Sequence, residues 1–347
     1  MKRLPADQLL AWFAHARRDL PWRQQRTPWR VWVAEIMLQQ TTALVASKRF
    51  PEFMQRFATP RALAGAEESA ALAAWAGLGY YRRVRSLQQA ARVVVRDHAG
   101  SVPRNEQILR GLPGIGDYTA AAIVALAFNQ PAAVIDANVA RVMARWLGHE
   151  SPVNSQAFRS AAREVLLHSV PAAQARNFSE ALIELGALLC RAAAADCAAC
   201  PLARSCVAHS TQSVERFPHP APRKLSTAVD SLRLLVRRGR RVVMVQRPAD
   251  AALLPGFWEL PGAWLPRGSA TDAAMLRTLL APIGLKAAGE GRVLRQVSHS
   301  ITTHRLRCRL VEVDARGRLR SAALVDPTAP QRNLTTESAK RLRVGAI

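Results

Sequence analysis

Four cysteines in one short stretch of the chain are spaced as ligands of a metal group. They form a C-x6-C-x2-C-x5-C pattern and are Cys190, Cys197, Cys200 and Cys206. Thiols this close together in a reducing compartment serve as metal ligands far more often than they form disulfides. Four-cysteine sites hold zinc or a [4Fe-4S] cluster, and zinc ribbons usually pair two short C-x2-C knuckles. Because only one such knuckle is present, the pattern favours the cluster, with zinc as the alternative.

Two carboxylic acids could act as an acid and a base. Glu35 lies among apolar residues in the segment 31–41, and such neighbours would desolvate it and raise its pKa, as a proton donor at neutral pH requires. Asp136 follows the apolar pair Val134-Ile135. Facing carboxyl groups of this kind can break a glycosidic bond. The alternatives are that Glu35 belongs to a solvated helix stripe with Gln39 and Thr42, and that Asp136 merely caps the helix 137–147.

A glycine-rich hairpin precedes Asp136. The segment 112–119 contains Pro113, Gly114 and Gly116, which favour a tight turn, and an apolar helix follows over residues 120–128. A turn that opens onto a helix N-terminus presents bare backbone N–H groups and can hold a phosphate. The alternative is an ordinary connector between two helices.

The composition points to a polyanionic partner. The chain has 347 residues with 49 Lys and Arg against 25 Asp and Glu, which gives a net charge of +24. Such an excess favours nucleic acid, with affinity that falls as salt rises. No segment has the length and apolarity of a membrane span or the pattern of a secretion signal. We therefore expect no membrane partner and a cytoplasmic protein that works at the bacterial nucleoid.

The pattern of apolar residues predicts two domains. A helical domain covers residues 1–216, and a Pro-rich basic linker covers residues 217–228. Residues 229–347 show the alternation of strands. The predicted helices span residues 31–50, 69–75, 84–97, 119–128, 138–146, 156–167 and 177–190. The predicted strands span residues 231–236, 241–246, 292–297 and 306–313.

Together these motifs resemble the helix-hairpin-helix-Gly/Pro…Asp superfamily of DNA base-excision glycosylases, and within it the MutY family of adenine glycosylases. The resemblance also rests on Pro21-Trp22-Arg23, Leu38-Gln39-Gln40-Thr41, the segment 178–186 and the cysteine spacing of the loop 190–206. It implies a mainly α glycosylase fold with an iron–sulfur loop, followed by an α+β Nudix-like domain. The implied reaction is excision of adenine opposite 8-oxoguanine or guanine in double-stranded DNA, by a monomer that carries a [4Fe-4S] cluster.

The resemblance also implies roles for individual residues. Glu35 would protonate adenine N7, Asp136 would stabilise the sugar cation or bond to it transiently, and Asn138 would orient this pair. Bifunctional relatives have a Lys where this chain has Tyr118, and a phenol forms no Schiff base. The resemblance thus implies a monofunctional glycosylase that leaves the abasic strand largely intact.

The resemblance implies further contacts with DNA. Those expected to bind the substrate base and its surroundings are Arg18, Leu20, Trp22, Arg23, Leu38 and Glu180. Those expected to contact the opposite strand or its oxidised guanine are Gln39, Gln40, Thr41 and the wedge residue Tyr80. Gly114 and Gly116 would contact a DNA phosphate. The alternative for Tyr80 and Tyr81 is that both are aromatics that pack between helices.

The chain departs from the family pattern at several positions. Asp117 stands where Arg is usual, and we expect it to cap the following helix. Ala137 replaces a Gly, which suggests a backbone conformation compatible with a Cβ. In the C-terminal part, the segment 277–284 lacks the Glu residues of a Nudix metal site, so we expect a recognition module. Its guanine-sensing residue would be Thr302, with Ser298-His299 or a plain polar turn as alternatives.

Two other functions remain open from the sequence. One is a related glycosylase for thymine in mismatches, or one that resembles endonuclease III. The other is a non-catalytic iron–sulfur protein that only binds DNA. Intact Glu35 and Asp136 argue against the second, and the C-terminal domain argues against the first.

Overall fold

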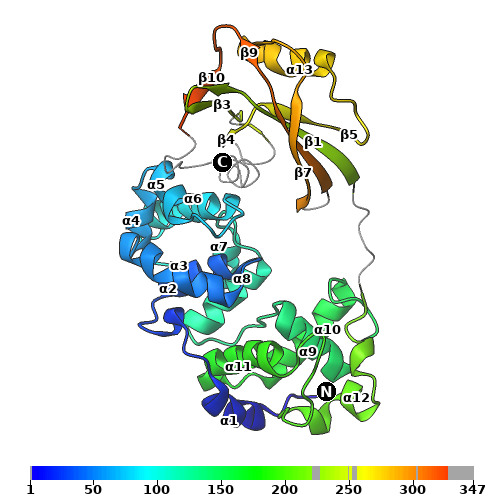
Figure 1. Cartoon of the computed structure of the whole chain (residues 1–347). Coiled ribbons are helices and arrows are strands. Elements are labelled where there is room, and N and C mark those ends of the chain that lie inside the picture. The colour runs from blue at the N-terminus through cyan, green and yellow to red at the C-terminus, as the bar shows by residue number, and fades with distance from the viewer. Residues whose placement is uncertain (1, 221–226, 249, 252–255, 302–303, 327–347) are drawn as a thin grey trace. The chain divides into compact units, whose positions relative to one another are not determined.

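The computed structural model describes residues 2–220, 227–248, 250–251, 256–301 and 304–326. The chain divides into two compact units, residues 1–222 and 223–347 (Figure 1). The boundary falls within the Pro-rich segment 217–228, where a run of prolines favours neither helix nor sheet. Each unit has its own hydrophobic core.

The first unit is helical, as its apolar periodicity predicts. Its α-helices are α1 Ala6–Ala16, α2 Pro28–Leu38, α3 Ala43–Arg56, α4 Pro60–Ala64, α5 Glu68–Ala74, α6 Arg82–Asp97, α7 Glu106–Arg110, α8 Asp117–Ala122, α9 Ala137–Leu147, α10 Gln156–Ser169, α11 Ala175–Leu188 and α12 Val207–Ser210. A π-helical turn, η2 Ile123–Ala127, continues α8. The short 3-10 turns are η1 Pro21–Arg23, η3 Ala172–Gln174, η4 Ala203–Ser205 and η5 Val214–Arg216. No helix within the described ranges combines the length and apolarity needed to cross a bilayer.

The predicted helix 31–50 is in fact two helices. α2 ends at Leu38 and α3 begins at Ala43, with the Thr42 hydroxyl accepting a hydrogen bond from the Val45 N–H as its N-cap. The connector includes Gln40, whose φ of +54° lies in the left-handed region. Because the chain turns here, Glu35 shares no helix stripe with Thr42, and Glu35 is only 4% exposed. The solvated-stripe alternative for Glu35 is therefore wrong.

The helical unit contains two separate cores. The first lies around α2, α3, α5, α6 and α8, and its fully buried side chains include Trp32, Phe50 and Trp75. The second joins α1 to α9, α10 and α11. The segment from 128 to 136 runs from η2 of the first core to α9 of the second. Glu35 thus comes from the first core, and Asp136 comes from the edge of the second.

The second unit is an α+β unit of short sheets and one helix. Its main sheet has the order β5-β1-β8-β7, in which β1 pairs in parallel with β8 and the other neighbours are antiparallel. A second sheet has the order β10-β3-β2, with β4 paired to β3. The strands are β1 Thr227–Leu235, β2 Arg237–Arg238, β3 Arg241–Gln246, β4 Trp258–Glu259, β5 Gly262–Pro266, β6 Lys286–Ala287, β7 Arg292–Ile301, β8 His304–Glu312, β9 Ala315–Arg316 and β10 Ala322–Val325.

The helix of this unit packs on the sheet core. It is α13 Ala273–Leu280, followed by the 3-10 turn η6 Ala281–Ile283, and its Leu276 and Leu280 are fully buried. The sequence of α13 contains no carboxylate. Cys308 is fully buried in β8.

Candidate active site

Glu35 is a buried acid held by one phenol. Its carboxyl lies in α2, and the Tyr118 hydroxyl donates a hydrogen bond of 2.6 Å to Oε2. The pKa of Glu35 is raised from 4.5 to about 7, and burial is the largest cause. The charges of Asp136 and Glu180 act in the same direction, whereas the Tyr118 hydrogen bond and Arg23 act against it. Glu35 therefore carries a proton in a large fraction of molecules at neutral pH.

Asp136 lies at the N-cap of α9. Its Oδ1 accepts a hydrogen bond of 2.7 Å from the Val139 N–H, and its Oδ2 accepts one of 3.0 Å from the Asn138 amide. Burial raises the pKa of Asp136, while these hydrogen bonds lower it. The charge of Asp136 also raises the pKa of both Glu35 and Tyr118. The fold therefore brings the two carboxyl groups and the phenol into one site. Asp136 does cap α9, as the alternative predicts, so one side chain both caps the helix and lies in the site.

Of the two glycines in the hairpin before α8, Gly114 is the one that the backbone requires. Gly114 has a φ of +77°, and a Cβ there would lie 2.6 Å from the Ser86 Cβ. Gly116 is the N-cap of α8, and no side chain caps this helix. Asp117 does not cap it, contrary to expectation. Its carboxylate is exposed and pairs with Arg110 at 3.2 Å, because Arg110 from α7 lies within reach across the hairpin.

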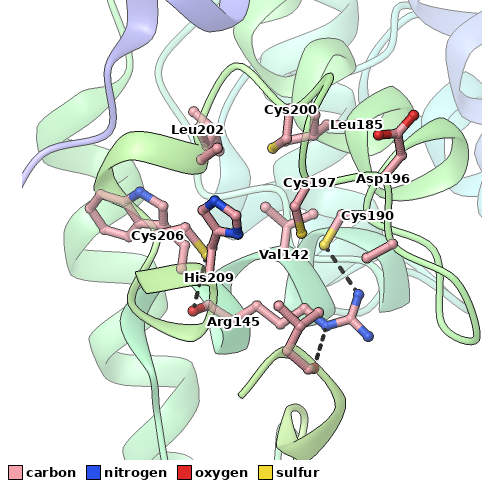
Figure 2. A pocket seen from close by; sticks show the side chains of 14 residues that line it. Val142, Arg145, Leu185, Cys190, Asp196, Cys197, Cys200, Leu202, Cys206 and His209 are labelled. Carbon is pink, nitrogen blue, oxygen red and sulfur yellow. Dashed lines mark hydrogen bonds between the residues drawn. The ribbon is translucent and has the colours of Figure 1, made fainter. Parts of the chain in front are cut away.

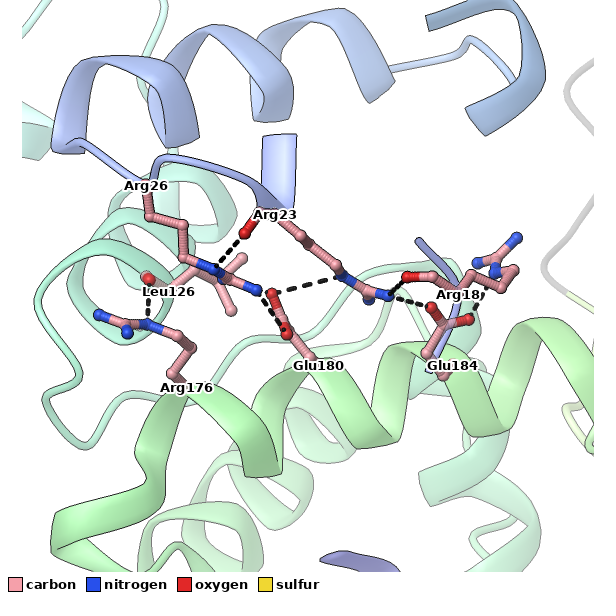
Figure 3. A network of polar contacts seen from close by, with 7 residues as sticks. All are labelled: Arg18, Arg23, Arg26, Leu126, Arg176, Glu180 and Glu184. Atoms are coloured by element: carbon pink, nitrogen blue, oxygen red, sulfur yellow. Dashed lines mark hydrogen bonds and ion pairs between the residues drawn. The ribbon is translucent and has the colours of Figure 1, made fainter. Parts of the chain in front are cut away.

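A network of arginines and glutamates borders this site (Figure 3). Glu180 and Glu184 lie one turn apart on the buried face of α11. Arg26 binds both oxygens of Glu180 at 2.6 and 3.0 Å, and Arg23 donates to Glu184 at 2.5 Å. Arg18 also contacts Glu184, at 2.7 Å. These ion pairs compensate for the burial of Glu180.

Sequence reasoning singled out Arg18, Arg23 and Glu180 but missed their partners Arg26 and Glu184. The available signal was a pair of Glu residues four positions apart in an otherwise apolar helix, which requires buried cations nearby.

The other expected base-binding residues lie at the edge of the first core. Trp22 is buried and packs edge-on against Phe50, with ring centroids 5.9 Å apart. Leu20 and Leu38 are partly buried and pack on the same core. These three residues therefore serve the packing of α2 and α3 in this structure.

The residues expected to contact the opposite strand differ in exposure. Gln39 donates to the Thr119 hydroxyl at 3.2 Å, which ties the end of α2 to α8. Thr41 is half-buried, and its hydroxyl donates to the Gln39 carbonyl. Gln40 is exposed, and Tyr80 is 56% exposed. The packing alternative is thus wrong for Tyr80, while Tyr81 does pack on the first core. The expected guanine sensor, Thr302, lies outside the described residues.

Arg141 joins the site to the cysteine loop. Its guanidinium donates to the Asn138 amide oxygen at 3.0 Å, to the Gly186 carbonyl at 2.8 Å and to the Cys190 carbonyl at 2.8 Å. The Asn138 amide, which holds Asp136, is therefore itself held by Arg141, and Arg141 is anchored to the Gly186 carbonyl of α11. Sequence reasoning missed Arg141, whose only local signal is its place one turn after Asn138.

We expect Gly186→Ala to disturb the site through Asn138. An added Cβ would lie 2.6 Å from the Asn138 Cβ and 2.9 Å from its carbonyl oxygen, so α9 and α11 would have to separate. Overpacking of this kind typically costs about 1–3 kcal/mol. The expected result is a lower midpoint of thermal unfolding together with slower catalysis, measured by circular dichroism and by product release. Gly65→Ala is the matched control, since a Cβ there would meet only the Arg61 carbonyl oxygen, at an ordinary contact distance of 3.6 Å. Equal stability of the two variants would contradict the packing argument.

All four cysteines of the motif line one pocket, with apolar walls that include Val142, Leu185 and Leu202 (Figure 2). The pKa of the Cys200 thiol is raised to about 11, mainly by burial and in part by the neighbouring cysteines. Within the described ranges, no three His, Cys, Asp or Glu side chains converge as ligands of one metal ion.

Arg145 fixes the wall of this pocket. Its guanidinium donates to the Cys190 sulfur at 3.4 Å and to the Arg191 carbonyl at 2.7 Å. It also reaches the carbonyls of Val214 and Phe217, at 3.1 and 3.0 Å. Four cysteines around one pocket are the ligand set of an iron–sulfur cluster, so these residues fit such a group.

Comparisons with known proteins agree with this geometry. Residues 33–166 match the family described as HhH-GPD superfamily base excision DNA repair protein. The chain is 36% identical over 285 residues to the adenine DNA glycosylase of Mycobacterium tuberculosis, which covers 82% of this chain and 91% of that protein. It is 32% identical over 349 residues to the human adenine DNA glycosylase, and this match covers 85% of this chain but only 64% of the human protein.

Solved structures show the same helical fold. A thermostable thymine-DNA glycosylase is 31% identical with a TM-score of 0.55, and the match covers 59% of this chain and 95% of that chain. A non-covalent endonuclease III–DNA complex is 23% identical with a TM-score of 0.51, and the match covers 60% of this chain and 94% of that chain. Both coverages correspond to about the length of the helical unit.

Proposed function

Because this chain belongs to the adenine DNA glycosylase family, we propose that it removes adenine from duplex DNA where adenine is paired with 8-oxoguanine or with guanine. The chain is a DNA N-glycosylase of base excision repair. The observation that carries the proposal is the buried Glu35, with a pKa of about 7, in the same site as Asp136. A proton donor and a carboxylate are the two groups that this bond cleavage needs.

In the proposed reaction, Glu35 donates its proton to N7 of an extruded adenine. The bond between C1′ of the sugar and N9 then breaks, and its electron pair leaves with the base. The Asp136 carboxylate stabilises the positive charge that develops on the sugar. A water molecule then adds to C1′, and its proton returns to Glu35. Tyr118 holds Glu35 throughout and offers no amine for strand scission.

The partner and cofactor follow from the same family. Duplex DNA would meet the exposed Gln40 and Tyr80 and the hairpin at Gly114 and Gly116, and the net charge of +24 supports a polyanionic ligand. The four cysteines would hold a [4Fe-4S] cluster that cross-links the end of the helical unit. We further propose that the protein acts as a monomer in the bacterial cytoplasm.

One experiment tests substrate and reaction type together. The protein is incubated with duplexes that carry A:8-oxoG, A:G, T:G or A:T, and base release is scored separately from strand nicking. We expect release from A:8-oxoG and A:G, with nicking only after alkali treatment. Release of a base from the T:G duplex alone would overturn the proposed specificity for adenine. Covalent trapping by borohydride that disappears in Tyr118→Phe would overturn the monofunctional reaction.

A further inference from the structure

Two exposed side chains of the helical unit stand on strained backbone. Gln40, between α2 and α3, has a φ of +54°, and Tyr80, just before α6, has a φ of +46°. Residues with side chains rarely adopt this region, and such a conformation persists only where the surroundings enforce it. Some contact must therefore hold these two turns in place.

Arg83 makes that contact on both sides. Its Nη1 donates to carbonyls at the end of α2, those of Ile36 at 2.8 Å, Met37 at 3.1 Å and Gln39. In the turn before α6, its Nη2 donates to the Leu78 carbonyl at 3.0 Å and to the Gly79 carbonyl at 3.2 Å. In the connector between α2 and α3, the same nitrogen donates to the Thr41 hydroxyl at 3.2 Å. One guanidinium thus bonds to the residues next to Gln40 and next to Tyr80.

The same guanidinium lies against two aromatic rings. Its central carbon is 5.5 Å from the ring centre of Tyr80 and 5.5 Å from that of the fully buried Trp75. The indole N–H of Trp75 donates to the Gly79 carbonyl at 3.2 Å, which adds a second contact that holds the turn before α6. Burial lowers the pKa of Arg83 to about 10, so it stays charged at neutral pH and can attract both ring faces.

We propose that Arg83 is a positioning residue that sets the spacing and orientation of Gln40 and Tyr80, the two side chains expected to enter the duplex. The inference rests on the proposed function, because it assigns Arg83 to the alignment of these residues against DNA. Only a planar group with several donors can bond to both turns at once, whereas Lys offers a single ammonium.

The first test compares Arg83→Gln and Arg83→Lys with Arg82→Gln. Arg82 is the exposed neighbour and loses the same charge, so it controls for weaker attraction to DNA. We expect single-turnover adenine release from A:8-oxoG to fall about 100-fold in Arg83→Gln and at least about tenfold in Arg83→Lys, since small misplacements cost this much. Arg82→Gln should stay within about threefold, the size of a lost surface charge. Equal rates in Arg83→Gln and Arg82→Gln would overturn the proposal.

A double-mutant cycle separates positioning from general stability. If Arg83 acts through Tyr80, then Tyr80→Leu should slow release strongly in the wild-type background but add less than about threefold in Arg83→Gln. Fully multiplicative effects would show that Arg83 only stabilises the fold. Should Arg83→Gln fail to fold, Tyr80→Phe and Tyr80→Leu in the wild-type background decide. Phe keeps a ring face for the guanidinium, so equal losses in these two variants would overturn the proposal.

A measurement without DNA keeps this inference distinct from the proposed function. Hydrogen exchange in Arg83→Lys should speed up in the segments 36–41 and 77–81, whereas exchange in α9 should not change. Unchanged exchange in the two segments would overturn the role of Arg83 whatever the substrate is. Loss of adenine release in the wild-type protein would instead overturn the proposed function and leave the exchange result standing.

Discussion

Replacing Glu35 by Gln is expected to slow single-turnover adenine release by roughly 10³-fold, within the range that general acid catalysis contributes. Gln has nearly the same shape but no proton to give to N7, so binding to an A:8-oxoG duplex should stay within a few-fold of wild type. The rates come from quenched reactions and the affinities from fluorescence anisotropy. An equally active Glu35→Gln variant would remove Glu35 from the mechanism.

The pH dependence follows from the same carboxyl group. Wild-type release should fall as pH rises through about 7, since the proton on Glu35 is then lost. The folded protein also binds this proton more tightly than the unfolded chain, in which the pKa of Glu35 is near 4.5. Glu35 therefore contributes less to stability as pH rises from 4.5 to 7. Glu35→Gln should unfold at a higher temperature than wild type at pH 8, and this gain should shrink toward pH 5.

Replacing Asp136 by Asn is expected to slow release by roughly 10²–10³-fold, the effect of losing one preorganised charge at the reacting atom. Asn is also a good N-cap, so α9 should keep its first turn and the unfolding midpoint should change little. Asp136→Ala removes the charge and the cap together and should lose about 1 kcal/mol of stability as well. Release rates and urea unfolding curves measure the two effects.

The comparison of the two Asp136 variants identifies the role of the carboxylate. If Asp136→Asn were as active as wild type while Asp136→Ala were not, Asp136 would act only as a helix cap. The hydrogen bond to the Val139 N–H would then be the whole of its contribution.

The residues of the candidate site could be predicted because their signals are local. Apolar neighbours on both sides of Glu35 indicate its burial, and the position of Asp136 before an amphipathic helix indicates a cap. The break between α2 and α3 was missed although the polar residues 39–42 mark it, because the cap residue Thr42 was assigned to a solvated stripe instead. In the second unit, alternation located β1, β3, β7 and β8 but missed the other described strands, which are shorter. β7 also extends to Ile301, because pairing with β8 decides where it ends.

The long-range contacts could not be predicted in the same way. Arg83, Arg141 and Arg176 are tied to main-chain carbonyls that belong to other helices. The periodicity of the sequence does not predict such an arginine, because its partner is a main-chain carbonyl of another segment rather than a side chain. The π-helical turn η2 illustrates this, since the carbonyls of Leu126 and Ala127 accept hydrogen bonds from Arg176 at 2.7 and 2.9 Å.

These arginine ties change what the net charge of the chain means for binding. A guanidinium that bonds to oxygens inside the fold, as those of Arg83, Arg141, Arg145 and Arg176 do, has fewer hydrogens to offer to an external anion. Salt weakens DNA binding in proportion to the number of phosphates that are neutralised, not to the total charge of a protein. The formal charge of +24 therefore overstates the number of counterions that this protein releases when it docks on a duplex. These four arginines instead join segments of the helical unit to one another.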